Sequence, residues 1–222
     1  LVDAGGIPQS ITAKPVPSTI GGTVVVLVGT GQLIGISDLV TTQQQSFYAV
    51  KDVLGSTALG NPRVAATKFV KQTITLSVCT AAQVAAGICF TGEQVSNSTN
   101  NVVNFATDNG WYLDLPRTGE RANTDPTNIL GELVFNTNLP GGGACSIGGD
   151  SFEYFLDYRT GAPLSTALGV AGKKLGNSLA TSVKPLINTG QGDPSNPGSA
   201  TGQIKLYGFT RLGSGDNAIL PL

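Results

Sequence analysis

Short apolar and β-branched runs, each bounded by Gly, Pro or Asn, recur along the whole chain. Over residues 73–78 apolar residues alternate with Thr and Ser, the period of a strand that buries one face. The run 24–28 has no polar position, and we expect a central strand covered on both sides. The pattern predicts strands at 23–29, 45–51, 73–78, 133–136, 152–157 and 203–209.

Helical signals are sparse. Residues 80–86 can form a turn or two with Thr80 as the N-cap, whereas glycines argue against a helix over 165–175. Two polar stretches, 96–101 and 188–202, predict exposed loops because they contain almost no apolar side chains. The predicted class is therefore all-β, with long surface loops.

One weak internal repeat suggests the architecture. Ser46-Phe-Tyr-Ala-Val-Lys-Asp52 and Ser151-Phe-Glu-Tyr-Phe-Leu-Asp157 both run from Ser-Phe through apolar residues to Asp, and a glycine follows each. Repeated antiparallel blades use such strands, because Asp supports the turn and Gly supplies positive φ. We expect one partial β-propeller domain over 1–222, with blades and insertions in 1–187, a loop at 188–202, and a final strand and tail at 203–222.

The amino-acid composition favours some classes of protein and excludes others. Only 12% of residues are charged, the chain has 30 glycines, and Met and His are absent, which is typical of a turn-rich exported β protein. The net charge of −1 leaves no basic surface for nucleic acid. No run approaches the roughly 20 apolar residues of a membrane-spanning helix. The sequence begins at Leu1 without Met, which indicates either a removed leader or a piece of a longer polypeptide, and we expect the second.

Candidate catalytic chemistry is weak. The absence of His removes the commonest general base and zinc ligand, and no run of oxygen ligands suggests a calcium loop. Asp114 and Glu120 flank Arg117 and Arg121, which favours ion pairs or turn caps over acid–base catalysis. Trp111 stands beside a Tyr, which favours packing in the core or between blades over ligand stacking. We expect no enzymatic activity, cofactor or metal in this chain.

The three cysteines indicate an oxidising compartment. Cys79 and Cys89 are close enough in sequence to close a small loop, and a disulfide between them is the preferred pairing. Two buried free thiols are the alternative. Cys145 is left either with a partner outside this chain or as a free thiol.

Two sets of motifs follow one another in order. The first is Gln9-Ser-Ile-Thr-Ala-Lys-Pro15, Val28-Gly-Thr-Gly-Gln-Leu-Ile-Gly-Ile-Ser-Asp-Leu39 and Thr42-Gln-Gln-Gln-Ser-Phe-Tyr-Ala-Val-Lys-Asp52. The second is Gly110-Trp-Tyr-Leu-Asp-Leu-Pro116, Gly119-Glu-Arg121 and Cys145-Ser-Ile-Gly-Gly149. In this order they resemble the propeller segment of the PilY1/PilC-type proteins of the bacterial type IV pilus. The positions that carry the resemblance are Gly29, Gly31, Ser37, Asp38, Phe47, Tyr48, Asp52, Trp111, Asp114, Gly119, Glu120, Arg121, Gly148 and Gly149.

The resemblance implies a propeller of about seven blades that acts in pilus biogenesis and adhesion. It implies an extracellular position at the pilus tip or outer cell surface. The implied partners are minor pilins or the tip complex, the rest of the same polypeptide or another chain, and a host or surface receptor. The family's acidic calcium loop has no counterpart in these residues and would lie upstream of Leu1.

The length allows about three four-stranded blades, at roughly 40 to 50 residues each. Such an open set of blades would expose strand edges and apolar faces unless other residues or a partner cover them. Two alternative functions fit an all-β chain of this kind. One is a passive structural subunit of a surface fibre, and the other is a quinoprotein-like propeller oxidoreductase.

Overall fold

The computed structural model describes residues 1–141, 148–188 and 205–221. Within these ranges the strands form three sheets, and helical structure is limited to one short α-helix and two 3-10 turns. In chain order the elements are β1 (Val16–Ile20), β2 (Thr23–Gly29), η1 (Ile36–Val40), β3 (Ser46–Lys51), η2 (Ala65–Thr67), β4 (Phe69–Gln72), β5 (Ile74–Val78), α1 (Ala81–Ala85), β6 (Gln94–Ser98), β7 (Gly110–Asp114), β8 (Thr127–Ile129), β9 (Glu132–Gly141), β10 (Gly148–Asp157), β11 (Val170–Gly176), β12 (Lys184–Asn188), β13 (Lys205–Arg211) and β14 (Asn217–Pro221).

The first sheet has the strand order β1-β2-β3-β7-β4. β1 and β2 form a hairpin through Gly21 and Gly22, whose φ angles of 55° and 84° suit a tight two-residue turn. β2 is rich in Val, a residue that fits the pleated surface of a strand. β2 is an interior strand, as its uninterrupted apolar run predicts, and β4 adds to the far edge parallel to β7.

The second sheet has the order β5-β6-β11-β10-β9-β8. Its centre is the long hairpin of β9 and β10, which pair from Gly141–Gly148 to Glu132–Asp157. β5 is an edge strand, and its predicted apolar face is largely open to solvent, since Leu76 and Val78 are 38% and 61% exposed. The third sheet is the antiparallel set β12-β13-β14.

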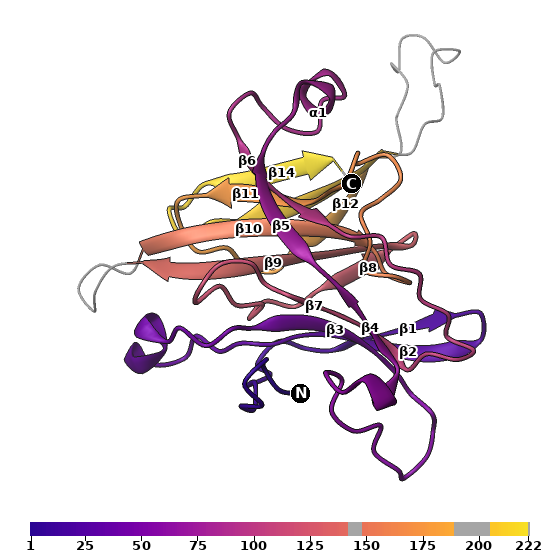
Figure 1. Cartoon of the computed structure of the whole chain (residues 1–222). Coiled ribbons are helices and arrows are strands. Elements are labelled where there is room, and N and C mark those ends of the chain that lie inside the picture. Colours follow the sequence, from indigo (N-terminus) through magenta and orange to yellow (C-terminus); the bar gives the residue numbers. More distant parts are fainter. Residues whose placement is uncertain (142–147, 189–204, 222) are drawn as a thin grey trace.

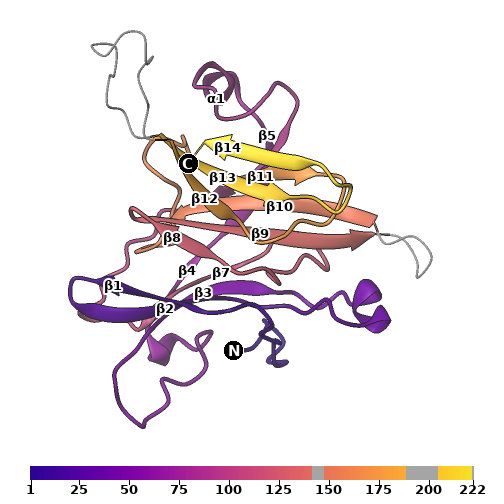
Figure 2. The same ribbon diagram turned by 180° about the vertical axis from the view of Figure 1, so that it is seen from behind.

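The three sheets are stacked as layers (Figures 1 and 2). The second sheet lies in the middle, with the first sheet on one face and the third on the other. Asn136 in β9 links the second and third layers, because its Nδ2 donates to the Thr210 hydroxyl of β13 over 2.9 Å. The N-terminal segment lies on the outer face of the first sheet (Figure 1).

The main hydrophobic core fills the space between the first and second sheets. The rings of Phe47 and Phe135 stack with centroids 4.1 Å apart, and Phe135 stacks in turn on Tyr154 at 5.1 Å. Trp111 is fully buried, and a Cβ at position 161 would lie 2.5 Å from its ring. Glycine at 161 therefore lets the chain after β10 pass directly over the indole.

The all-β class and the partial-propeller stacking predicted from the sequence are confirmed. The two repeated segments are β3 and the second half of β10, interior strands of neighbouring sheets. The predicted four strands per blade are not observed, because the sheets have five, six and three strands within the described residues. Short strands that the sequence pattern did not predict, such as β4 and β8, add to the edges of the first two sheets.

The predicted helical turn is confirmed as α1, which Thr80 caps by accepting from the Gln83 amide. The predicted loop at 96–101 is wrong in its first half, because β6 continues to Ser98. Backbone pairing of β6 with β5 and β11 makes the first half of that stretch part of the sheet. Cys145 and most of the predicted loop 188–202 lie outside the described residues. No helix in the described part of the chain is long and apolar enough to cross a membrane.

Candidate functional site

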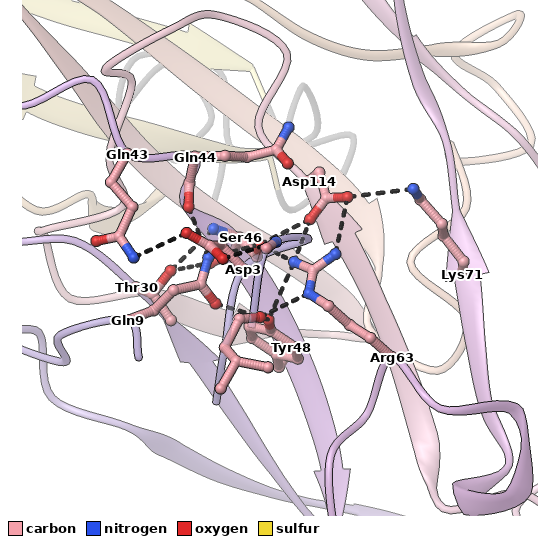
Figure 3. Close-up of polar contacts among 12 residues, drawn as sticks. Asp3, Gln9, Thr30, Gln43, Gln44, Ser46, Tyr48, Arg63, Lys71 and Asp114 are labelled. Atoms are coloured by element: carbon pink, nitrogen blue, oxygen red, sulfur yellow. Dashed lines mark hydrogen bonds and ion pairs between the residues drawn. The ribbon is translucent and has the colours of Figure 1, made fainter. Parts of the chain in front are cut away.

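A network of polar side chains lies on the outer face of the first sheet (Figure 3). The Arg63 guanidinium meets the Asp114 carboxylate end-on, with Nη2–Oδ1 at 2.5 Å and Nη1–Oδ2 at 3.1 Å. Such a bidentate, charge-assisted pair is among the strongest side-chain contacts. Nη2 also donates to Ser46 Oγ at 2.8 Å, and the guanidinium lies 5.0 Å from the centre of the Tyr112 ring.

Burial and neighbouring charges shift the pKa values of groups in this network. Burial would raise the pKa of Asp114, but hydrogen bonds from Arg63 and Ser46 and the charge of Arg63 lower that pKa below its usual value. Lys71 adds a second cation, with Nζ 3.2 Å from Asp114 Oδ2. Burial raises the pKa of Tyr48, so its hydroxyl stays protonated at neutral pH.

The same network fixes the N-terminal segment to the sheet. The Tyr48 hydroxyl lies 2.7 Å from Gln9 Oε1, and Gln9 Nε2 donates to Ser46 Oγ at 3.0 Å. Gln43 Nε2 donates to the Asp3 carboxylate at 3.0 Å, and this bond is the main cause of a lowered Asp3 pKa. Ser46 is fully buried and hydrogen-bonded, so its hydroxyl is held as a structural group.

Beside the network lies a mostly apolar groove of about 600 Å³, here called the outer groove. Its floor includes Val26, Val50 and Phe69 from the outer face of the first sheet, and the loop 53–62 forms one wall. Leu1 and Val2 lie at its edge. Arg63 helps to set its shape, because its Nε donates to the Val2 carbonyl at 2.6 Å.

A second cluster surrounds Arg121. Its guanidinium donates to the carbonyls of Gln32, Asp38 and Thr41 at 3.0, 2.5 and 3.1 Å. It therefore fixes both ends of a loop, residues 32–41, here called the tip loop. Burial lowers the pKa of Arg121, opposed by the charge of Asp38. The loop carries η1 and projects past the end of β3 (Figure 1).

Asp38 stabilises the tip loop from inside. Its carboxylate accepts from the amides of Gly35 and Ile34 at 2.9 and 2.8 Å and from Gln32 Nε2 at 2.8 Å. These bonds, the Gly35 amide first, lower the pKa of Asp38 to about 2. The loop is thus a fixed structure, although three of its aliphatic side chains are open to solvent.

Glycines 29 and 31 allow the Arg121 segment to approach β2. A Cβ at position 29 would lie 2.6 Å from that of Ala122, and one at position 31, where φ is 124°, would overlap Arg121. The close approach lets the Ala122 amide donate to the Thr30 carbonyl at 2.9 Å. Gly119, with φ 78°, turns the chain so that its carbonyl accepts from Arg121 Nε at 3.0 Å.

Glu120 is fully buried between the first two sheets. It accepts from the Thr137 hydroxyl at 2.6 Å, from the Tyr154 hydroxyl at 2.9 Å and from Arg117 Nη1 at 3.3 Å. Burial raises its pKa, and these donors oppose that effect. The Arg117 guanidinium also lies 3.7 Å above the Phe152 ring. The Glu120 carboxylate thus accepts hydrogen bonds from three neighbouring side chains, as a buried structural carboxylate does.

The other motif positions also have local structural contacts. Asp52 caps a turn by accepting from the Leu54 amide at 2.8 Å, and the Ser37 carbonyl accepts from the Thr41 hydroxyl at 3.3 Å. Gly148 pairs with Gly141, and at Gly149, with φ 152°, a Cβ would overlap the Leu139 carbonyl. Phe47 and Trp111 are core residues, as predicted for Trp111.

The structure therefore groups most of the predicted motif residues around three centres: the core, the Arg63–Asp114 network and the Arg121 cluster. Of the ion pairs or turn caps expected among Asp114, Glu120, Arg117 and Arg121, an ion pair of Arg117 with Glu120 is present. Asp114 pairs instead with Arg63 and Lys71, which are remote in sequence. Sequence reasoning missed Arg63, because it lies in a loop without periodicity and no local pattern marks it.

The predicted disulfide between Cys79 and Cys89 is present, with Cα atoms 6.2 Å apart. It closes the loop that contains α1 and packs with Val95 and Val170 in a second small core. In the described residues, no three His, Cys, Asp or Glu side chains gather into a group that could hold a metal ion.

The comparisons with known proteins show a likeness of fold. No protein-family model matches the sequence, and no curated protein matches it. Among solved structures, the chain is similar to the C-terminal domain of PilY1 from Pseudomonas aeruginosa, with a TM-score of 0.66 and 19% sequence identity. The match covers 100% of this chain and 46% of that chain, so this chain spans about half of its length.

Proposed function

We propose that this chain is a surface-exposed protein-contact module of the type IV pilus system, which acts in pilus biogenesis and adhesion. The observation that carries the proposal is the likeness to the PilY1 C-terminal domain, since it extends over the whole of this chain. The ordered motifs that centre on Arg121 and on the first sheet support the same assignment. The proposed partners are minor pilins or the tip complex, other parts of the same polypeptide, and a host or surface receptor.

The tip loop is the proposed contact surface. Ile34, Ile36 and Val40 are 81%, 73% and 77% exposed, yet Arg121 and Asp38 fix the backbone that carries them. A group of aliphatic side chains on a rigid projection is typical of a protein-contact site. Because the loop is already ordered, binding would lose little conformational entropy.

The proposed location is extracellular, at the pilus tip or the outer cell surface, after export through the periplasm. The Cys79–Cys89 disulfide supports this location, because disulfides persist in oxidising compartments.

The test is a tip-loop variant of the parent protein, Ile34→Ser with Ile36→Ser, expressed in the bacterium that encodes it. We expect co-purification of minor pilins with the protein to fall at least ten-fold, and twitching and surface attachment to fall with it. Val102→Ser is the matched control, because Val102 is 84% exposed outside the tip loop.

Three outcomes would count against the proposal. Wild-type protein that co-purifies with no pilus component would remove its basis. Imaging that places the protein along the whole pilus shaft would favour a passive fibre subunit instead. An absorbance band of a bound quinone in natively purified protein would favour the oxidoreductase.

A further inference from the structure

A cavity of about 170 Å³ opens on the face of the second sheet that points away from the first sheet. Glu153 on β10, Glu132 on β9 and Lys173 on β11 line it, together with Phe155, Ile88 and Leu164. Gly87 and Thr166, both exposed, lie at its mouth. This acidic cavity shares no lining residue with the outer groove or the tip loop.

Glu153 is the unusual group in this cavity. The residue is only 1% exposed, and its Oε2 has no hydrogen-bond partner within the part of the chain that the structure describes. A buried carboxylate without a partner is costly in free energy, and buried polar groups are normally satisfied. A functional ligand that supplies hydrogen bonds and positive charge would remove this cost.

The surrounding charges indicate which ligand fits. Lys173 is the cross-strand neighbour of Glu153, but its Nζ points to the Ile88 carbonyl, 3.4 Å away. On the other side of β10, the neighbour of Glu153 is Asn136 of β9, and Glu132 lies four residues before Asn136 on the same face of the sheet. With all three side chains ionised the cavity has one excess negative charge, and one monovalent cation balances it.

We propose that the acidic cavity binds a primary ammonium group, with the Glu153 carboxylate as its acceptor and Glu132 as a second negative charge that lines the same cavity. An ammonium group supplies positive charge and three donors, and the unpaired Glu153 Oε2 can accept from one of them. A calcium ion fits less well, because it takes 6 to 8 oxygen ligands and two carboxylates supply at most four.

The walls of the acidic cavity also suit such a ligand. At about 30 Å³ per molecule its volume equals that of five or six waters, enough for an ammonium group with a short alkyl chain. Phe155, Leu164 and Ile88 provide apolar contacts for that chain, and the Phe155 ring can add a cation–π contact. The ammonium group could belong to a lysine side chain of a partner protein or to a free alkylamine.

Binding should depend on pH. Burial raises the pKa of Glu153 and of Glu132 to about 7, opposed at Glu153 by the charge of Lys173. These three are the titratable side chains that line the cavity. An alkylammonium stays charged at pH 8.5, since amines of the lysine type titrate near pH 10.4. Affinity should therefore rise about ten-fold from pH 6.0 to pH 8.5 as a carboxylate loses its proton.

The experiment is a titration of the ¹⁵N-labelled 222-residue chain, followed by amide chemical shifts at pH 8.5 and constant ionic strength. The probes are n-butylamine, cadaverine, Nα-acetyl-lysine N-methylamide and calcium chloride, with sodium chloride as the reference. We expect saturable shifts for amides near Phe155 and Lys173 with the amine probes. Tighter binding of the lysine analogue assigns a partner's lysine, and tighter binding of the free amines assigns a small molecule.

Glu153→Gln should weaken amine binding at least ten-fold. Asp150→Asn is the matched control, because it removes one negative charge from the same strand outside the cavity, and it should change the affinity less than two-fold. Glu132→Gln and the pH series on the wild-type chain provide the same test if Glu153→Gln does not fold. The proposal is overturned by an absence of saturable shifts at 50 mM amine, by unchanged affinity in Glu153→Gln, or by calcium binding that depends on Glu153.

Discussion

Replacement of Arg63 by Met is expected to destabilise the chain by about 3 kcal/mol. The Arg63 and Asp114 side chains are 10% and 12% exposed, so the substitution leaves a largely buried carboxylate without its main partner. Removing one member of such a pair typically costs about 3–5 kcal/mol. The lower end applies here, because Lys71 remains 3.2 Å from Asp114 and compensates part of the charge.

The assay is urea denaturation at pH 7, in which a lower midpoint at constant slope reports lost stability. Asp114→Asn and the double variant Arg63→Met with Asp114→Asn complete a double-mutant cycle. We expect the double variant to be more stable than Arg63→Met alone, because no uncompensated carboxylate remains. A loss below about 1 kcal/mol in Arg63→Met would refute the reasoning, since that is the value of an exposed pair.

The pH dependence provides an independent check. The Asp114 pKa is lowered in the folded chain, so the stability from this pair is present above the ordinary Asp pKa of about 3.9 and is lost as the pH falls below it. The wild-type chain should therefore lose more stability than the double variant between pH 5 and pH 2. Equal acid sensitivity of the two proteins would show that the pair contributes nothing.

Three further predictions concern other parts of the chain. Replacing Cys79 and Cys89 by Ser should lower the free energy of unfolding by roughly 2.7 kcal/mol, and dithiothreitol should have the same effect on the wild type but none on the variant. Gly161→Ala should destabilise by about 1–3 kcal/mol in urea denaturation, because its Cβ would overlap the Trp111 ring; a neutral effect would mean that the ring can move. Glu153→Gln should raise the urea midpoint at pH 8 but not at pH 4.5, since a folded pKa near 7 makes wild-type stability fall as the pH rises through that value, and an equal gain at both values would contradict the burial argument.

The sequence by itself determined the local features of this protein. The continuous apolar run 24–28 predicted the interior strand β2, and the alternating run 73–78 predicted a strand, β5, although that strand lies at a sheet edge with its apolar face largely exposed. Thr80 predicted the start of α1, and the spacing of Cys79 and Cys89 predicted their disulfide. Each of these depends on residues within about a dozen positions of one another, so the pattern is readable along the chain.

Only the tertiary structure decided the sites. Asp114 follows Leu113 in β7, and because successive strand residues point to opposite faces, the carboxylate lies on the outer face and meets Arg63. Glu153 lies beside Lys173 because the pairing of β10 with β11, after a register shift between Ser151 and Phe152, sets these two residues opposite each other. The number of strands per sheet likewise depends on short strands that pair with segments distant in sequence, as β4 does with β7. These contacts join residues that are remote in sequence, and no local pattern encodes which of them meet.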